Sequence, residues 1–183
     1  MPSRAIDAPL AWNVAGLLAD DPGAERVYPV AGVTIDLDDL ALASPIEGRV
    51  RLLRTNRGIL ASASLRAALA LQCSRCLRDV VEPVSIDIQE EYLPSLDLAT
   101  GRPLATDDEP DVARLTDHHE LDLETPVREA LQLAEPIAPL CRPDCPGLCI
   151  VCGERLDEGE HDHPTDDIDP RLEALRGFKA DDG

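Results

Sequence analysis

The six cysteines of this chain fall into three close pairs, and this spacing constrains the fold more than any other feature of the sequence. The pairs are Cys73-x-x-Cys76, Cys141-x-x-x-Cys145 and Cys149-x-x-Cys152. A C-x-x-C turn places two thiolates on one side of a single metal ion, and Zn²⁺ is the usual occupant of such sets. We therefore expect the fold to bring each pair next to further ligands.

The last cysteine pair is followed, after a short polar loop, by a His-x-His pair. These four residues predict a structural zinc site with Cys149, Cys152, His161 and His163 as ligands. Gly147 and Gly153 flank the cysteines, as in a zinc knuckle, where backbone amides must turn toward sulfur. Free cysteines in a loop beside two surface histidines are the alternative.

The other two pairs predict a second, all-cysteine site formed by Cys73, Cys76, Cys141 and Cys145. Such a site would join a turn of the sheet to the segment that leaves a helix. A single shared site and thiols without metal are the alternatives, so the expected cofactor is structural zinc, as one or two ions. A catalytic zinc is disfavoured because it needs an open position for water and a nearby general acid or base. A dithiol redox role stays open, because C-x-x-C thiols can have a lowered pKa.

The sequence also indicates a compartment. No apolar run approaches the roughly 20 residues needed to cross a bilayer, and residues 1–7 have no apolar segment typical of a secretion signal. We expect a cytoplasmic protein without a membrane partner. In the cytoplasm, paired cysteines are more often metal ligands or redox groups than structural disulfides.

Alternating apolar and polar residues predict an antiparallel sheet over about residues 26–92. Strands are expected at 26–30, 32–37, 46–53, 59–73 and 80–91, with a hairpin turn at 55–58 and a second turn at Cys73–Cys76. Residues 59–73 are rich in alanine, which favours a helix, but their period of two fits a strand better. Pro83 indicates that the last strand lies at an edge or begins there.

Helices are expected on either side of the cysteine-rich segment. Residues 120–134 predict a helix with an apolar stripe, Thr125 as its cap and Pro126 in its first turn, and residues 169–178 predict a short C-terminal helix. The expected fold is α+β: an antiparallel sheet with one or two packing helices and a C-terminal segment resembling a zinc knuckle. The predicted division is a core at 1–140, a metal-binding segment at 141–165 packed on it, and a helix and tail at 166–183.

Charge is spread unevenly along the chain, whose formal net charge is −19. Residues 1–92 have 9 basic and 13 acidic side chains, whereas residues 93–183 have 8 and 23. This balance opposes broad nucleic-acid binding, and aromatic residues, at 2%, are too few for base stacking. Residues 48–78 nevertheless contain no acid and seven arginines, which predicts contact with phosphate or an acidic protein face. The candidates for contact with RNA or a partner are Arg49, Arg51, Arg54 and Arg57.

Short motifs along nearly the whole chain resemble one bacterial family. They include Asn13-Val-Ala15, Arg54-Thr-Asn-Arg-Gly-Ile-Leu60, Cys73-Ser-Arg-Cys-Leu77, Glu90-Glu-Tyr-Leu-Pro94, Glu120-Leu-Asp-Leu123 and Gly147-Leu-Cys149-x-x-Cys152-Gly153. Together these resemble the YceD family. Some members have C-x-C where this chain has His161-x-His163, and Cys and His are exchangeable as zinc ligands. Other members lack the C-terminal cysteines, so the metal is not expected to be the function that the family shares.

The resemblance implies a function that composition does not. Family members are implicated in accumulation of the large-subunit (23S) ribosomal RNA and are not known as enzymes. The implied protein is a non-enzymatic ribosome-biogenesis factor that binds a large-subunit precursor, rRNA or a basic ribosomal protein, with no small-molecule substrate. A dithiol redox or metal-dependent enzyme is the alternative.

Overall fold

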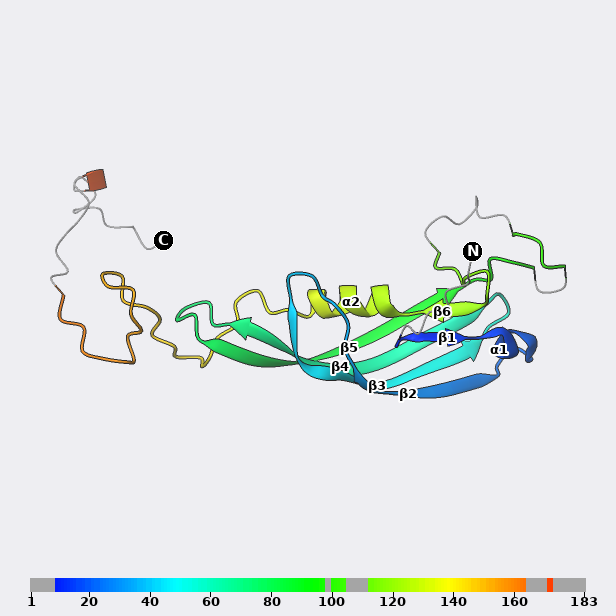
Figure 1. The fold of residues 1–183 in the computed structure, drawn as a ribbon, viewed down its shortest axis with the longest axis horizontal. Coiled ribbons are helices and arrows are strands. Elements are labelled where there is room, and N and C mark those ends of the chain that lie inside the picture. Colours follow the sequence, from blue (N-terminus) through cyan, green and yellow to red (C-terminus); the bar gives the residue numbers. More distant parts are fainter. Residues whose placement is uncertain (1–8, 98–99, 105–111, 164–170, 173–183) are drawn as a thin grey trace, which may run out of the picture.

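The computed structural model describes residues 9–97, 100–104, 112–163 and 171–172, and its centre is an antiparallel sheet (Figure 1). Its four strands are β2 (Glu25–Val33), β3 (Ala41–Arg54), β4 (Ile59–Gln72) and β5 (Asp79–Tyr92), hydrogen-bonded in the order β2-β3-β4-β5. A smaller antiparallel pair consists of β1 (Ala11–Asn13) and β6 (Glu120–Asp122). The described helices are α1 (Ala15–Ala19) and α2 (Glu124–Leu133). The expected α+β class with an antiparallel sheet is confirmed.

Residues 59–72 form strand β4, although their alanine content favours a helix and only their period of two favours a strand. Its odd-numbered residues from Ile59 to Leu69 are buried, while Ser64, Arg66 and Ala70 on the other face are exposed. The strand prediction is confirmed, and the helical propensity of alanine is overridden by burial of one face. We call the buried side of the sheet its inner face and the opposite side its outer face.

Strand β5 lies at an edge of the sheet, as Pro83 indicates. Pro83 sits opposite Ala68 of β4, and because proline has no N–H to donate, an edge strand tolerates it. Strands β4 and β5 are 14 residues long, so the hairpin extends roughly 45 Å. Its turn, residues 73–78, therefore lies far from the opposite end of the sheet (Figure 1).

Two predicted strands near the N-terminus are in fact one. Strand β2 is continuous from Glu25 to Val33, with a bulge between Val30 and Val33. Beyond it the chain turns back, so that Leu37 pairs with Leu40 instead of extending a second strand. The predicted strand at 46–53 is also longer than expected, because β3 begins at Ala41. The hairpin turn at 55–58 is confirmed by the bond from Thr55 N–H to the Gly58 carbonyl, 3.0 Å.

Helix α2 covers the inner face of the sheet, with Leu123, Val127 and Leu131 buried against it (Figure 1). The predicted start at Glu120 is wrong, because residues 120–122 pair with β1. The predicted cap at Thr125 is wrong as well: the Asp122 carboxylate accepts from the Glu124 amide at 2.8 Å, and Thr125 lies inside the helix. Pro126 occupies the first turn, as expected.

After α2 the chain runs toward the turn between β4 and β5 and places residues 141–163 beside it (Figure 1). The C-terminal helix predicted at 169–178 lies outside the described residues, apart from 171–172. In the described part of the chain, no helix is long and apolar enough to cross a membrane.

Candidate metal centres

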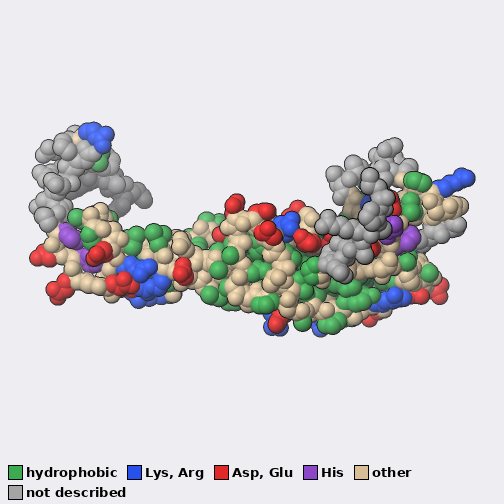
Figure 2. Space-filling model, viewed as in Figure 1, with side chains coloured by type: hydrophobic (Ala, Val, Ile, Leu, Met, Phe, Trp, Pro, Cys, Tyr) green, Lys and Arg blue, Asp and Glu red, His purple; other side chains and the backbone are tan. Residues whose placement is uncertain are grey.

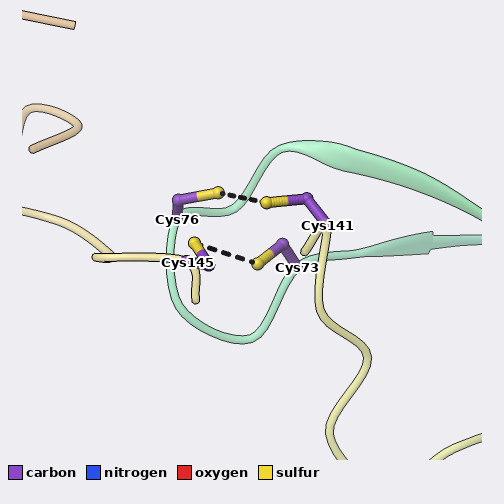
Figure 3. A group of neighbouring side chains, drawn as sticks. All are labelled: Cys73, Cys76, Cys141 and Cys145. Carbon is purple, nitrogen blue, oxygen red and sulfur yellow. Dashed lines mark hydrogen bonds between the residues drawn. The ribbon is translucent and has the colours of Figure 1, made fainter. Parts of the chain in front are cut away.

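The first cluster joins two segments that are far apart in the sequence. Cys73 and Cys76 belong to the turn that ends the β4–β5 hairpin, and Cys141 and Cys145 belong to the segment after α2 (Figure 3). The four sulfur atoms lie within 4.8 Å of one another. Cys73, Cys76 and Cys145 are buried and Cys141 is partly buried. We call these four residues the hairpin cluster.

The sulfur positions in the hairpin cluster suit one metal ion. Sγ of Cys73 lies 3.8 Å from Sγ of Cys145, and Sγ of Cys76 lies 3.6 Å from Sγ of Cys141 (Figure 3). Zinc–sulfur bonds of about 2.3 Å in a tetrahedron place the sulfurs about 3.8 Å apart. All six cysteines are free thiols in the structure. The donor set and its spacing fit a tetrahedral thiolate site.

The burial of four thiols has an electrostatic consequence. The backbone amide of Cys141 donates to the sulfur of Cys73 and, with the amides of Cys76 and Arg75, lowers the pKa of Cys73 to about 6 against the effect of burial. Burial raises the pKa of Cys141 to about 12 and also raises the pKa of Cys145. One thiolate is therefore favoured, while further ionisation is opposed. A divalent cation would compensate that cost, because thiolates are the form that binds metal.

The second cluster lies wholly within the segment after α2. Ligand atoms of Cys149, Cys152, His161 and His163 lie within 4.8 Å of one another, and we call these four residues the knuckle cluster. Sγ of Cys152 is 3.5 Å from Nδ1 of His161, which fits the roughly 3.6 Å expected when both bind one tetrahedral zinc. The amides of Cys152 and then Val151 donate to Cys149 and lower its pKa.

The histidines of the knuckle cluster are oriented as metal ligands. Nε2 of His161 lies 3.0 Å from the carbonyl oxygen of Arg155, so it donates there and leaves the lone pair of Nδ1 directed at Cys152. Nε2 of His163 is buried and has no hydrogen-bond partner among the described residues. A buried polar atom without a partner is costly, and a bound metal ion would supply the partner.

The two C-x-x-C turns share one backbone geometry. The amide of Leu77 donates to the Cys73 carbonyl, and the amide of Gly153 donates to the Cys149 carbonyl, both at 2.9 Å. Both residues have positive φ, 56° for Leu77 and 76° for Gly153. Glycine adopts this conformation readily, whereas leucine does so at a cost. In both turns, amides between the two cysteines and at the second cysteine donate to the sulfur of the first.

Arginine side chains hold the clusters together. Arg75 donates to the carbonyl of Cys145 at 2.9 Å, and Nε of Arg155 donates to the carbonyl of Cys76 at 3.1 Å. Arg78 pairs with Glu158 at 2.9 Å, and Arg142 pairs with Asp157 at 3.2 Å. Arginine, aspartate, glutamate and histidine side chains gather at this end of the molecule in Figure 2. No sequence pattern singles out Arg155 or Arg142, whereas Arg75 could have been suspected from its place inside Cys73-x-x-Cys76.

The four arginines predicted to contact RNA or a partner are not brought together. Arg49 and Arg51 lie exposed on the outer face, with Arg66 of β4 on the same face, and Arg51 pairs with Glu25 at 3.7 Å. Arg57 is exposed in the hairpin turn. Arg54 is half-buried and donates to the carbonyls of Leu18, Thr55 and Gly58. Arg54 therefore holds α1 and the turn to the sheet instead of facing outward.

Comparison with known proteins places this chain among relatives. An uncharacterised protein of Mycobacterium tuberculosis is 32% identical over 177 residues, covering 94% of this chain and 82% of the relative. An uncharacterised protein of Mycobacterium leprae is 28% identical over 184 residues, covering 98% and 82%. No solved structure matches the chain significantly. The family model described as large ribosomal RNA subunit accumulation protein YceD matches residues 61–179, a stretch that contains both clusters, and the chain belongs to this family.

Proposed function

We propose that this protein is a non-enzymatic ribosome-biogenesis factor that supports accumulation of large-subunit ribosomal RNA. The observation that carries the proposal is the family match over residues 61–179. The protein would act in the cytoplasm by binding an assembly intermediate, through rRNA or a ribosomal protein. It requires no bound small molecule in this role.

Zinc at both clusters is the structural part of the proposal. The donor sets, the sulfur separations and the partnerless Nε2 of His163 support it. Zinc in the hairpin cluster would fasten the segment at 141–165 to the core at 1–140, and zinc in the knuckle cluster would fold that segment itself.

The outer face of the sheet is the proposed contact for rRNA. Arg49 and Arg66 border an open hollow of about 400 Å³, which Ser64 and Ser85 also line. Among the described residues neither arginine forms an ion pair, so both guanidinium groups are available to phosphate oxygens. Asp87 lines the same hollow, but its carboxylate accepts from Ser64 at 2.7 Å. Arg51 and Arg57 would extend this contact.

The function is tested by removing the protein from the cell that makes it. We expect depletion to lower the ratio of large-subunit to small-subunit rRNA, and the wild-type chain to restore it. A variant with Arg49→Ser and Arg66→Ser should restore it less well, and Arg102→Ser, which removes one exposed charge elsewhere, should restore it fully. An unchanged rRNA ratio after depletion would contradict the proposed function.

The alternative redox function is tested separately. Metal analysis and thiol titration of the native protein should show stoichiometric zinc with protected thiols. Zinc-free protein, with reversible disulfide formation that the cell requires for normal rRNA levels, would instead favour a dithiol redox role.

A further inference from the structure

Leu77 is held in a conformation that its own side chain does not favour. Its φ is 56°, in the region where glycine is tolerated and where other residues with a Cβ are strained. The matching position of the other C-x-x-C turn is Gly153, with φ 76°. A leucine can offset such strain by burying its side chain, yet Leu77 is 55% exposed. The turn accounts for the backbone conformation but not for the exposed leucine side chain, which is therefore a candidate for contact with another molecule.

A second leucine lies beside Leu77. Leu77 and the partly buried Leu148 line one hollow between the hairpin turn and the segment after α2, together with Glu154 and Glu158. In the same segment Ile150 is 97% exposed, and Val151 and Leu156 are also exposed. Exposed aliphatic side chains of this kind indicate a protein contact. We call the hollow lined by Leu77 and Leu148 the distal apolar patch.

The solvent-exposed charged side chains around the distal apolar patch are mostly acidic. Residues 141–163 contain six acidic and two basic side chains. The side chains of the nearby arginines bond to groups of the same chain. Arg75 and Arg155 donate to backbone carbonyls, and Arg78 and Arg142 pair with acidic side chains. Glu154, which lines the hollow with Leu77, is exposed and has no ion pair among the described residues. Glu160 and Asp162 are exposed as well.

We propose that the distal apolar patch docks a basic segment of a protein, in which aliphatic side chains contact Leu77 and lysine or arginine side chains face the surrounding carboxylates. Charge complementarity selects this occupant, because an RNA strand would meet unpaired carboxylates, while the described arginines around the hollow already bond to carbonyls or carboxylates. The inference rests on the proposed function, to which it adds a class of partner. It also assigns protein and RNA to different parts of the molecule, the hairpin end and the outer face of the sheet.

Two substitutions remove the side chain of Leu77 while keeping its backbone conformation. Glycine and asparagine both tolerate positive φ, so Leu77→Gly and Leu77→Asn should keep the turn, the metal content and the thermal midpoint of the full chain. Val27→Ser is the matched control, because Val27 is also 55% exposed and lies on β2, away from the patch.

The probes are three short fluorescent peptides measured by anisotropy on the metal-loaded full chain. One alternates lysine with leucine, the second replaces leucine by serine, and the third replaces lysine by glutamate. We expect the wild type to prefer the lysine–leucine peptide, both Leu77 variants to bind it about tenfold more weakly or worse, and Val27→Ser to bind it as the wild type does.

Three results would overturn the inference. The first is that both Leu77 variants bind the lysine–leucine peptide with wild-type affinity. The second is that the wild type binds the lysine–leucine peptide and either altered peptide with equal affinity. The third is that an rRNA fragment displaces the peptide and itself needs Leu77 for binding. None of these depends on the rRNA ratio after depletion, so failure of the docking surface and failure of the proposed function are distinguishable.

Discussion

Arg155 contacts both clusters. Its Nε donates to the carbonyl of Cys76 in the hairpin cluster at 3.1 Å, and its own carbonyl accepts from His161 of the knuckle cluster at 3.0 Å. A shift of this one residue would therefore disturb the position of a ligand in each cluster. Outer contacts of this kind orient metal ligands and are part of how a site holds its ion.

The lowered pKa of Cys73 gives a prediction for the metal-free, reduced protein. The thiol has a pKa of about 6 in the folded chain, below its ordinary value of 9.0. A group whose pKa is lowered by folding stabilises the folded state above its unfolded pKa and loses that contribution as the pH falls. The free energy of unfolding should rise with pH between about 6 and 9. Urea denaturation in chelator and reductant measures this, and Cys73→Ser should flatten the rise. An equal slope in that variant would contradict the assignment.

At the scale of elements, the hairpin cluster connects the β4–β5 turn to the segment after α2. If Cys76 and Cys145 bind one ion, Cys76→Ser and Cys145→Ser should each lower stability as much as the double variant does, because either change opens the same site. Denaturant unfolding of the zinc-loaded proteins measures the three losses. The non-additivity should shrink in chelator. Additive losses in the presence of zinc would show that the two cysteines act separately.

Gly48 shows how close β3 and β4 approach just beyond the irregular part of their pairing. Its φ is 151°, and a Cβ there would overlap the carbonyl oxygen of Ser64. We expect Gly48→Ala to lower the free energy of unfolding by about 3 kcal/mol, because backbone of a central strand has to move. Gly159→Ala is the control, since a Cβ at Gly159 meets open space. A thermal midpoint of Gly48→Ala equal to that of the control would contradict this reading of the strand.

The sequence predicts elements where one pattern dominates and fails where tertiary contacts decide. Alternating burial identifies β4 and β5, and Pro83 correctly indicates an edge. The start of α2 was missed because Glu120–Asp122 pairs with β1, a strand over 100 residues earlier. Both ligand groupings were predicted from spacing, and the structure brings the same residues together. The role of Arg54 was not predictable, because its partner Leu18 is distant in sequence.

At the scale of the whole molecule, a net charge of −19 has to be reconciled with an RNA-related function. Arg49 and Arg66 lie on one face, so RNA would approach the outer side of the sheet. We expect Arg49→Ser and Arg66→Ser each to reduce the salt slope of binding to large-subunit rRNA by about one unit. Filter binding across a salt series measures the slope. Arg102→Ser should leave it unchanged, and an unchanged slope in the two outer-face variants would remove this face from the contact.

Two metal ions are proposed to complete the end of the molecule formed by the hairpin turn and residues 141–163. Native mass spectrometry of the chain purified without added metal tests this proposal. The wild type should have the mass of the polypeptide plus two zinc ions. Cys152→Ser, which changes only the knuckle cluster, should retain one, because the hairpin cluster has four sulfur ligands of its own. A metal-free mass, with all six thiols reacting freely in the native protein, would contradict the account.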